Sequence, residues 1–245
     1  MFRHQGKTRT AKHNLQIASL LSFVAGIVNV AGFLAVQKLT TNVTGHFAFF
    51  VDEILQLHFF NGMIYFLYVL FFLMGAFVSS FLVEIVSRKN ENLTFIIPIL
   101  IEILLLSSVA IFGNNLIYKF GNLIACTLLF SMGLQNALVT KISNSIVRTT
   151  HLTGLFTDLG IELSQLFFYK ELDLRNKLFS SIKLRLTIIT FFFLGGILGG
   201  LFYNQIQLKV LLIGAIVLII GLIYDYLKLK IILINRKYLN TSIEK

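Results

Sequence analysis

The 245-residue sequence contains one cysteine, one proline and only 11 acidic residues. A single cysteine, Cys126, excludes an intramolecular disulfide and any metal site built from several cysteines. Motifs of intramembrane proteases are also missing, because there is no H-E-x-x-H and no Gly-x-Ser nucleophile turn with a histidine at matching depth. We therefore expect no enzymatic activity, no cofactor and no metal.

The rest of the composition is dominated by apolar residues. Hydrophobic residues make up 56% of the chain, charged residues 13%, and the mean hydropathy is +0.83, more than a soluble domain of this size needs to fill one core. The apolar runs are too long and unbroken for the alternating strands of a membrane barrel. The fold class is therefore an all-α membrane protein. The net charge of +10 does not indicate nucleic-acid binding, because Lys and Arg lie beside the apolar runs rather than on one face.

A membrane-spanning helix needs about 20 apolar residues to cross a hydrocarbon core of about 30 Å. Six segments meet this length: 15–36, 61–86, 93–112, 119–140, 185–203 and 209–228. The first follows a basic N-terminus without a cleavage site and is predicted to be a retained signal anchor. Two further apolar segments, 41–58 and 149–169, carry acidic and histidine side chains and are ambiguous.

The distribution of positive charge favours six spans over eight. With six spans, both ambiguous segments enter and leave on one side, and of the 21 Lys and Arg residues only Lys38, Lys119 and Lys209 lie outside the cell. If both segments crossed, four cytoplasmic positive charges would move outside. We therefore expect both termini to be cytoplasmic, and 41–58 and 149–169 to be re-entrant or half-buried.

The chain repeats itself. Residues 20–54 align with 128–163, so that Gly26 and Asn29 pair with Gly133 and Asn136 at an offset of 107 residues. After a shift of two residues, four further pairs occur at an offset of 109 residues. They are Thr41 with Thr150, Thr44 with Thr153, Gly45 with Gly154, and Glu53 with Glu162. An offset of 120 matches the small-residue stretch that begins at Met74 with the one that begins at Leu194, a pattern typical of closely packed helices.

Three spans in each half predict an inverted repeat, because the second half enters the bilayer from the opposite side. The single transmembrane domain, residues 1–245, would consist of halves 13–112 and 119–238. Duplication of this kind is typical of transporters, which place their site between the halves.

The duplicated Thr-Gly pairs, Thr44-Gly45 and Thr153-Gly154, are the first candidates for a substrate site. Glycine permits a break or a close backbone approach, threonine supplies a hydroxyl, and the free N–H groups of a restarting helix favour an anionic group. A capping turn without ligand is the structural alternative. On the inverted arrangement, both turns are predicted to face one cavity near the midplane.

Three amide side chains inside the first and fourth spans are further candidates: Asn29, Gln135 and Asn136. An amide in hydrocarbon must find a polar partner, so each is expected to face protein, either as a contact between helices or as part of the solute site.

Glu102, near the centre of the third span, is the candidate proton-coupling residue, with a structural carboxyl as the alternative. Pro98, one turn earlier, is predicted to kink this helix. A cluster of His46, Asp52, Glu53 and His58 matches no metal-binding spacing and is interpreted as a wet interfacial face.

The first signature, Gly26 to Phe33 followed by Val43-Thr44-Gly45, resembles the bacterial YoaK family of unknown function, DUF1275, and so does Met132 to Ala137 followed by Thr150 to Gly154. The resemblance covers essentially the whole chain and implies a multi-pass protein of the bacterial inner membrane. Members commonly carry Asp where this chain has Asn29, and Asn where it has His46.

The sequence therefore predicts a small-solute transporter or channel subunit, of unknown solute, in the lipid bilayer. Six spans form a small bundle to enclose a pathway, which makes a homodimer plausible. The alternative is a non-transporting membrane scaffold or sensor in which the duplicated turns only pack.

Overall fold

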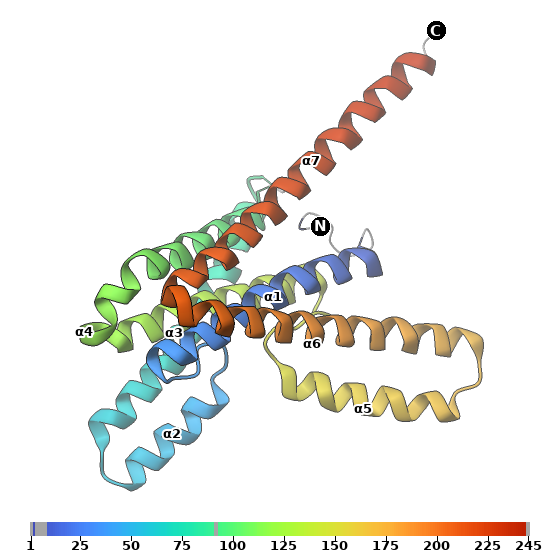
Figure 1. The fold of residues 1–245 in the computed structure, drawn as a ribbon. Coiled ribbons are helices and arrows are strands. Elements are labelled where there is room, and N and C mark those ends of the chain that lie inside the picture. The colour runs from blue at the N-terminus through green and yellow to red at the C-terminus, as the bar shows by residue number, and fades with distance from the viewer. Residues whose placement is uncertain (1, 3–8, 91–92, 244–245) are drawn as a thin grey trace.

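The computed structural model describes residues 2, 9–90 and 93–243, with side chains as far as residue 231 except residue 229. Arg3 and Lys7, which contribute to the predicted N-terminal orientation, lie outside this part. The described residues form helices and no strand (Figure 1). The elements are α1 (Ala11–Val36), α2 (Thr44–Leu55), α3 (Phe59–Ser87), α4 (Ile96–Ser143), α5 (Leu152–Phe168), α6 (Leu172–Ile206), the 3-10 helix η2 (Gln207–Val210) and α7 (Leu211–Ile243).

Helix α4 is two spans joined by a sharp bend. Its 48 residues would measure about 72 Å if straight, more than twice the thickness of a hydrocarbon core. Phe120 leaves the helical region at φ −131° and ψ 35°, and Figure 1 shows the helix reversing direction there. The predicted spans 93–112 and 119–140 fall on its two arms, which we call α4a (96–119) and α4b (121–143).

The kink is therefore not at Pro98, where we predicted one. Pro98 is the third residue of α4, in the first turn, where an N–H has no partner within the helix and a proline is tolerated.

The chain between α6 and α7 turns beside the bend in α4. Gln207 adopts φ 53° and ψ −136°, and the Leu208 backbone N–H donates to Asn114 Oδ1 at 3.0 Å. The two helix reversals therefore lie at the same end of the bundle. Helix α6 begins at Leu172, so it extends the predicted span 185–203 by about 13 residues at its N-terminal end.

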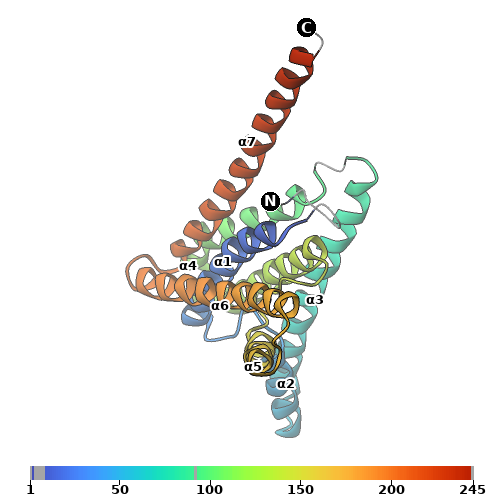
Figure 2. The ribbon, with the colours of Figure 1, turned by 90° about the vertical axis from the view of Figure 1, so that its right-hand side faces the viewer.

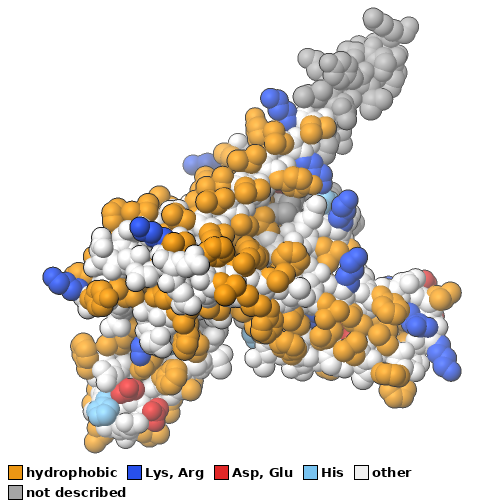
Figure 3. Space-filling model, viewed as in Figure 1, with side chains coloured by type: hydrophobic (Ala, Val, Ile, Leu, Met, Phe, Trp, Pro, Cys, Tyr) orange, Lys and Arg blue, Asp and Glu red, His pale blue; other side chains and the backbone are white. Residues whose placement is uncertain are grey.

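Four long apolar helical stretches in the described chain could cross a membrane: Ala11–Val36, Phe59–Ser87, Ile96–Ser143 and Leu172–Lys228. Large hydrophobic side chains such as Phe77, Leu104 and Ile197 are exposed on them. In Figure 3 hydrophobic side chains spread over the body, while Lys and Arg lie toward its margins. Because water disfavours so much exposed apolar surface, these faces contact lipid, and the protein is a helical membrane protein.

Helices α2 and α5 are half-length pieces. They contain 12 and 17 residues, or about 18 and 26 Å, which is too short to cross the core alone. Helix α2 packs along α3 and α5 along α6, and both begin near the middle of the molecule and run outward in different directions (Figures 1 and 2).

Glycines hold the central helices in backbone contact. A Cβ atom added to any of four glycines would lie 2.0 to 2.1 Å from a carbonyl oxygen of the neighbouring helix. The pairs are Gly26 with Phe192, Gly195 with Phe23, Gly75 with Phe130, and Gly133 with Phe72. The first two join α1 to α6, and the last two join α3 to α4b. The sequence offsets of 107 and 120 residues map each α1–α6 pair onto one of the α3–α4b pairs.

Replacing Gly26 or Gly133 with alanine should lower the free energy of unfolding by about 1–3 kcal/mol, because the new methyl group meets backbone that cannot move aside. Thermal unfolding of the purified protein in detergent measures the effect. Gly160→Ala is the matched control, since Gly160 is an exposed helical glycine with no atom within 4 Å of the added Cβ. Equal midpoints for all three variants would contradict the packing.

Candidate functional site

The first duplicated turn, residues 37–43, folds back onto α1. Gln37 ends the helix in the left-handed region at φ 53°. The Thr40 hydroxyl then donates to the Val28 carbonyl at 3.0 Å, and the Thr41 hydroxyl donates to Asn29 Oδ1 at 2.7 Å. Asn29 therefore holds the turn that follows its own helix.

The second turn, residues 144–151, repeats this arrangement on α4b. Asn144 ends the helix at φ 51°. The Gln135 amide donates to Thr149 Oγ1 at 3.1 Å, and the Asn136 amide donates to Thr150 Oγ1 at 2.7 Å. Gln135 also donates to the Leu21 carbonyl of α1 at 3.2 Å, which connects the two halves.

The Thr-Gly pairs lie at the start of α2 and α5, directly after these turns. A Cβ at Gly45 would lie 2.3 Å from Leu39 Cδ1, and one at Gly154 would lie 2.6 Å from His151 Nδ1. Glycine therefore allows a side chain of each turn to pack against the start of the helix that follows. The Thr44 and Thr153 side chains are exposed, and their hydroxyls make no hydrogen bond with any residue that the structure describes. The internal repeat aligned Thr41 with Thr150, but only the fold shows that these two threonines form the hydrogen bonds to the asparagines that hold the turns.

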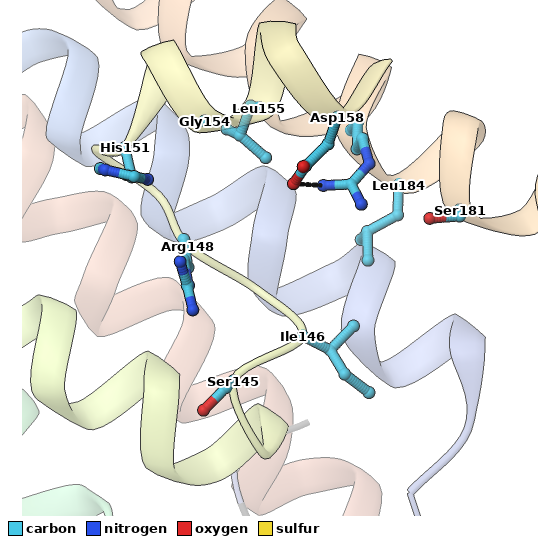
Figure 4. Close-up of a pocket in the computed structure, with 10 residues that line it drawn as sticks. Ser145, Ile146, Arg148, His151, Gly154, Leu155, Asp158, Ser181 and Leu184 are labelled. Carbon is cyan, nitrogen blue, oxygen red and sulfur yellow. Dashed lines mark hydrogen bonds and ion pairs between the residues drawn. The ribbon is translucent and has the colours of Figure 1, made fainter. Parts of the chain in front are cut away.

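A pocket of about 560 Å³ opens at the second turn, between the turn, α5 and α6 (Figure 4). It is lined by Ser145, Ile146, Arg148, His151, Gly154, Leu155, Asp158, Ser181, Leu184 and Arg185. Of the predicted site residues, Gly154 is in this lining, and Thr44 and Gly45 are not.

Ion pairs close one wall of this pocket. Arg185 on α6 donates from Nη1 to Asp158 Oδ2 at 2.8 Å, and from Nε and Nη2 to the two Glu162 oxygens at 2.9 Å each. Ser181 adds a hydrogen bond to Glu162 at 2.6 Å. These contacts clamp α5 to α6, and a bidentate arginine–carboxylate pair fixes their relative orientation.

Arg148 stands apart from this cluster. Figure 4 shows it on the turn across the pocket from Asp158, with His151 beside the start of α5. The Arg148 guanidinium makes no ion pair or hydrogen bond within the described part of the chain. One cationic group is therefore free to meet a ligand.

Asn136 lines a second pocket, of about 530 Å³, on the other side of the same turn. Its lining includes Thr140, Lys141 and Ser145, and Ser145 belongs to both pockets. Lys141 bridges to Glu84 of α3 at 2.9 Å.

The surroundings of the first turn are closed by aromatic packing. His46 on α2 is fully buried, its Nε2 lies 2.5 Å from the Leu39 carbonyl, and its ring lies 4.9 Å from that of Tyr68. Tyr68 donates to Asn122 Oδ1 at 2.6 Å, and Lys38 donates to the Tyr65 hydroxyl at 2.8 Å. The interpretation of His46 as part of a wet face is therefore wrong, because its side chain is fully buried against Tyr68 and the Leu39 carbonyl.

Glu102 is fully buried on α4a, and neither carboxyl oxygen has a hydrogen-bond partner among the residues that the structure describes. It lines neither pocket beside the second turn. Among the described residues, no group of three or more His, Cys, Asp and Glu side chains is arranged to hold a metal.

These features define a polytopic helical membrane protein with a charged pocket beside a half-length helix. The chain belongs to the family described as Protein of unknown function (DUF1275), whose model matches residues 17–224. Comparison with curated proteins and with solved structures gives no match.

Replacing Thr150 with valine should destabilise the protein by about 1–3 kcal/mol, because it leaves the NH2 group of Asn136 without its acceptor. Thr153→Val, three residues away, removes a hydroxyl that makes no such contact and should leave the thermal midpoint unchanged. The measurement is thermal unfolding in detergent. Similar midpoints for both variants would show that the Asn–Thr contact does not hold the turn.

Proposed function

We propose that this protein is a small-solute transporter of the bacterial cell membrane, with its solute site in the pocket at the second turn. The observation that carries the proposal is this pocket, because it combines a free guanidinium with an ion-paired cluster between a half-length helix and a membrane-spanning helix. Charged groups in such bundles are costly and typically mark solute or ion pathways. The proposal includes no enzymatic activity.

We infer that the two copies form an inverted three-plus-three repeat, which favours this mechanism. Two independent sets of contacts recur at the offsets of the sequence repeat, namely the glycine–carbonyl pairs and the amide–threonine pairs. Helix α1 and its counterpart α4b run in opposite directions in Figure 1, as inversion requires. Transporters with this symmetry place the solute between the repeats and expose it to each side in turn.

The two turns differ as alternating access would require. A pocket opens at the second turn, while at the first turn His46 is enclosed by Tyr68 and the Leu39 carbonyl. We infer that this conformation is open toward the side of α5 and closed toward the side of α2. In the opposite conformation, a pocket would open at the first turn and the second turn would be closed. In the scaffold alternative, both turns would stay packed and the charged pocket would have no role.

A transporter should move solute through a sealed membrane. Liposomes containing the purified protein are loaded with a pool of polar metabolites and diluted, and the contents that remain are measured by mass spectrometry. We expect selective loss of one chemical class, slowed by Arg148→Gln but not by Arg88→Gln, an exposed arginine outside the pocket. Retention of the whole pool, as in protein-free liposomes, would favour a scaffold or sensor.

The proposed orientation places both termini in the cytoplasm and opens the second-turn pocket toward the cytoplasm. Single cysteines at Asn90 or Asn144 in a Cys126→Ala background should resist a membrane-impermeant thiol reagent in intact cells. Cysteines at Asn115 or Asn204, at the opposite end of the bundle, should react. Labelling at Asn90 from outside would contradict the orientation and favour eight spans.

Glu102 is the proposed proton-coupling residue, because it is a buried carboxyl without a hydrogen-bond partner. Glu102→Gln keeps the shape of the side chain and removes its titration. The variant should fold with the normal thermal midpoint, and its solute efflux should lose its dependence on pH. Efflux that follows pH as in the unmodified protein would exclude coupling through Glu102.

A further inference from the structure

The pocket at the second turn separates opposite charges. At one wall, Asp158 shares the single guanidinium of Arg185 with Glu162, which lies outside the lining, and the three groups together carry a formal charge of one negative unit. Both Glu162 oxygens are bonded, whereas Asp158 uses only Oδ2 among the described residues. Asp158 Oδ1 therefore remains available to accept a hydrogen bond from a ligand.

The opposite side of the pocket is positive. Arg148 has no partner among the described residues, and Figure 4 shows it across the pocket from Asp158. The start of α5 adds to this charge, because the first hydrogen bond of the helix runs from the Leu155 N–H to the His151 carbonyl at 3.2 Å. His151 supplies no side-chain cap to this helix end, and Gly154, in the first turn of α5, lines the pocket. Free N–H groups and a guanidinium together favour a carboxylate.

We propose that this pocket binds a small zwitterion, a solute that carries both a carboxylate and an ammonium group, such as an amino acid. The carboxylate faces Arg148 and the first turn of α5, and the ammonium faces Asp158. The inference rests on the proposed transport function and specifies its substrate class.

Charge balance separates this ligand from simpler ones. A plain anion would gain the charge-assisted contact with Arg148, but it would lack the contact with Asp158 and bring its charge near a cluster that is already negative. A plain cation would gain the contact with Asp158 but lack the one with Arg148. A zwitterion neutralises both ends. Between the two ends, Ile146, Leu155 and Leu184 line the pocket and can contact an aliphatic side chain.

The experiment measures binding to the purified full-length protein in detergent. Thermal unfolding with each standard amino acid identifies those that stabilise the protein, and calorimetry then gives the Kd. For alanine, the matched probes are propionate, which lacks the ammonium, and ethylamine, which lacks the carboxylate; an analogous pair is used for any other amino acid that binds. We expect the amino acid to bind at least about tenfold more tightly than either probe, because each probe loses a charge-assisted contact.

Two variants test the ends separately. Arg148→Gln should weaken amino-acid binding by about ten- to hundredfold and abolish the advantage of the amino acid over its amine probe. Asp158→Asn should abolish the advantage over the carboxylate probe, and Arg185 would keep its two bonds to Glu162, so the α5–α6 clamp survives. Arg88→Gln is the control and should bind normally.

The proposal is overturned if no amino acid stabilises the protein, if a probe binds as tightly as its amino acid, or if both variants bind like the control. Transport can fail independently. Binding of amino acids without efflux from liposomes would contradict the proposed transport but support the zwitterion site. Efflux of another solute class without amino-acid binding would support transport but contradict the zwitterion site.

Discussion

The contact between glycine backbone and the carbonyl oxygens of neighbouring helices determines most of this architecture. In hydrocarbon, helix association depends on close packing, since lipid is as apolar as the side chains. Gly26 and Gly195 bring α1 and α6 together, and Gly75 and Gly133 do the same for α3 and α4b. Each half thereby contributes a helix to a pair with the other half, which places both duplicated turns within the joined structure.

Those turns interrupt the chain's helices, and each turn is held by a side-chain amide of the helix that precedes it. Thr41 bonds to Asn29 and Thr150 to Asn136, so each helix provides an amide for the turn that follows it. With the turns held in this way, the charged groups beside the second one stay in a defined arrangement. Arg185 fixes α5 against α6, and Arg148 remains free on the turn.

The candidate site illustrates what sequence comparison can and cannot find. Duplication identified both turns, and the need of a buried amide for a partner correctly predicted that Asn29, Gln135 and Asn136 face protein. The sequence did not show which threonines these amides bond, because Thr40, Thr41, Thr44 and their counterparts are all polar residues close together in sequence. The burial of His46 depends on the direction in which α2 leaves the turn, which no local pattern encodes.

The sequence by itself determined the class of the protein, because runs of about 20 apolar residues are stable only as helices in a bilayer, and this physics is local to each segment. It also showed the duplication, since a repeat is a property of the residue order. Only the tertiary structure decided that α4 bends at Phe120 rather than at Pro98, and that Arg148, Asp158 and Arg185 line one pocket. These outcomes depend on contacts between helices distant in sequence, and a site formed by such contacts exists only once the helices have packed.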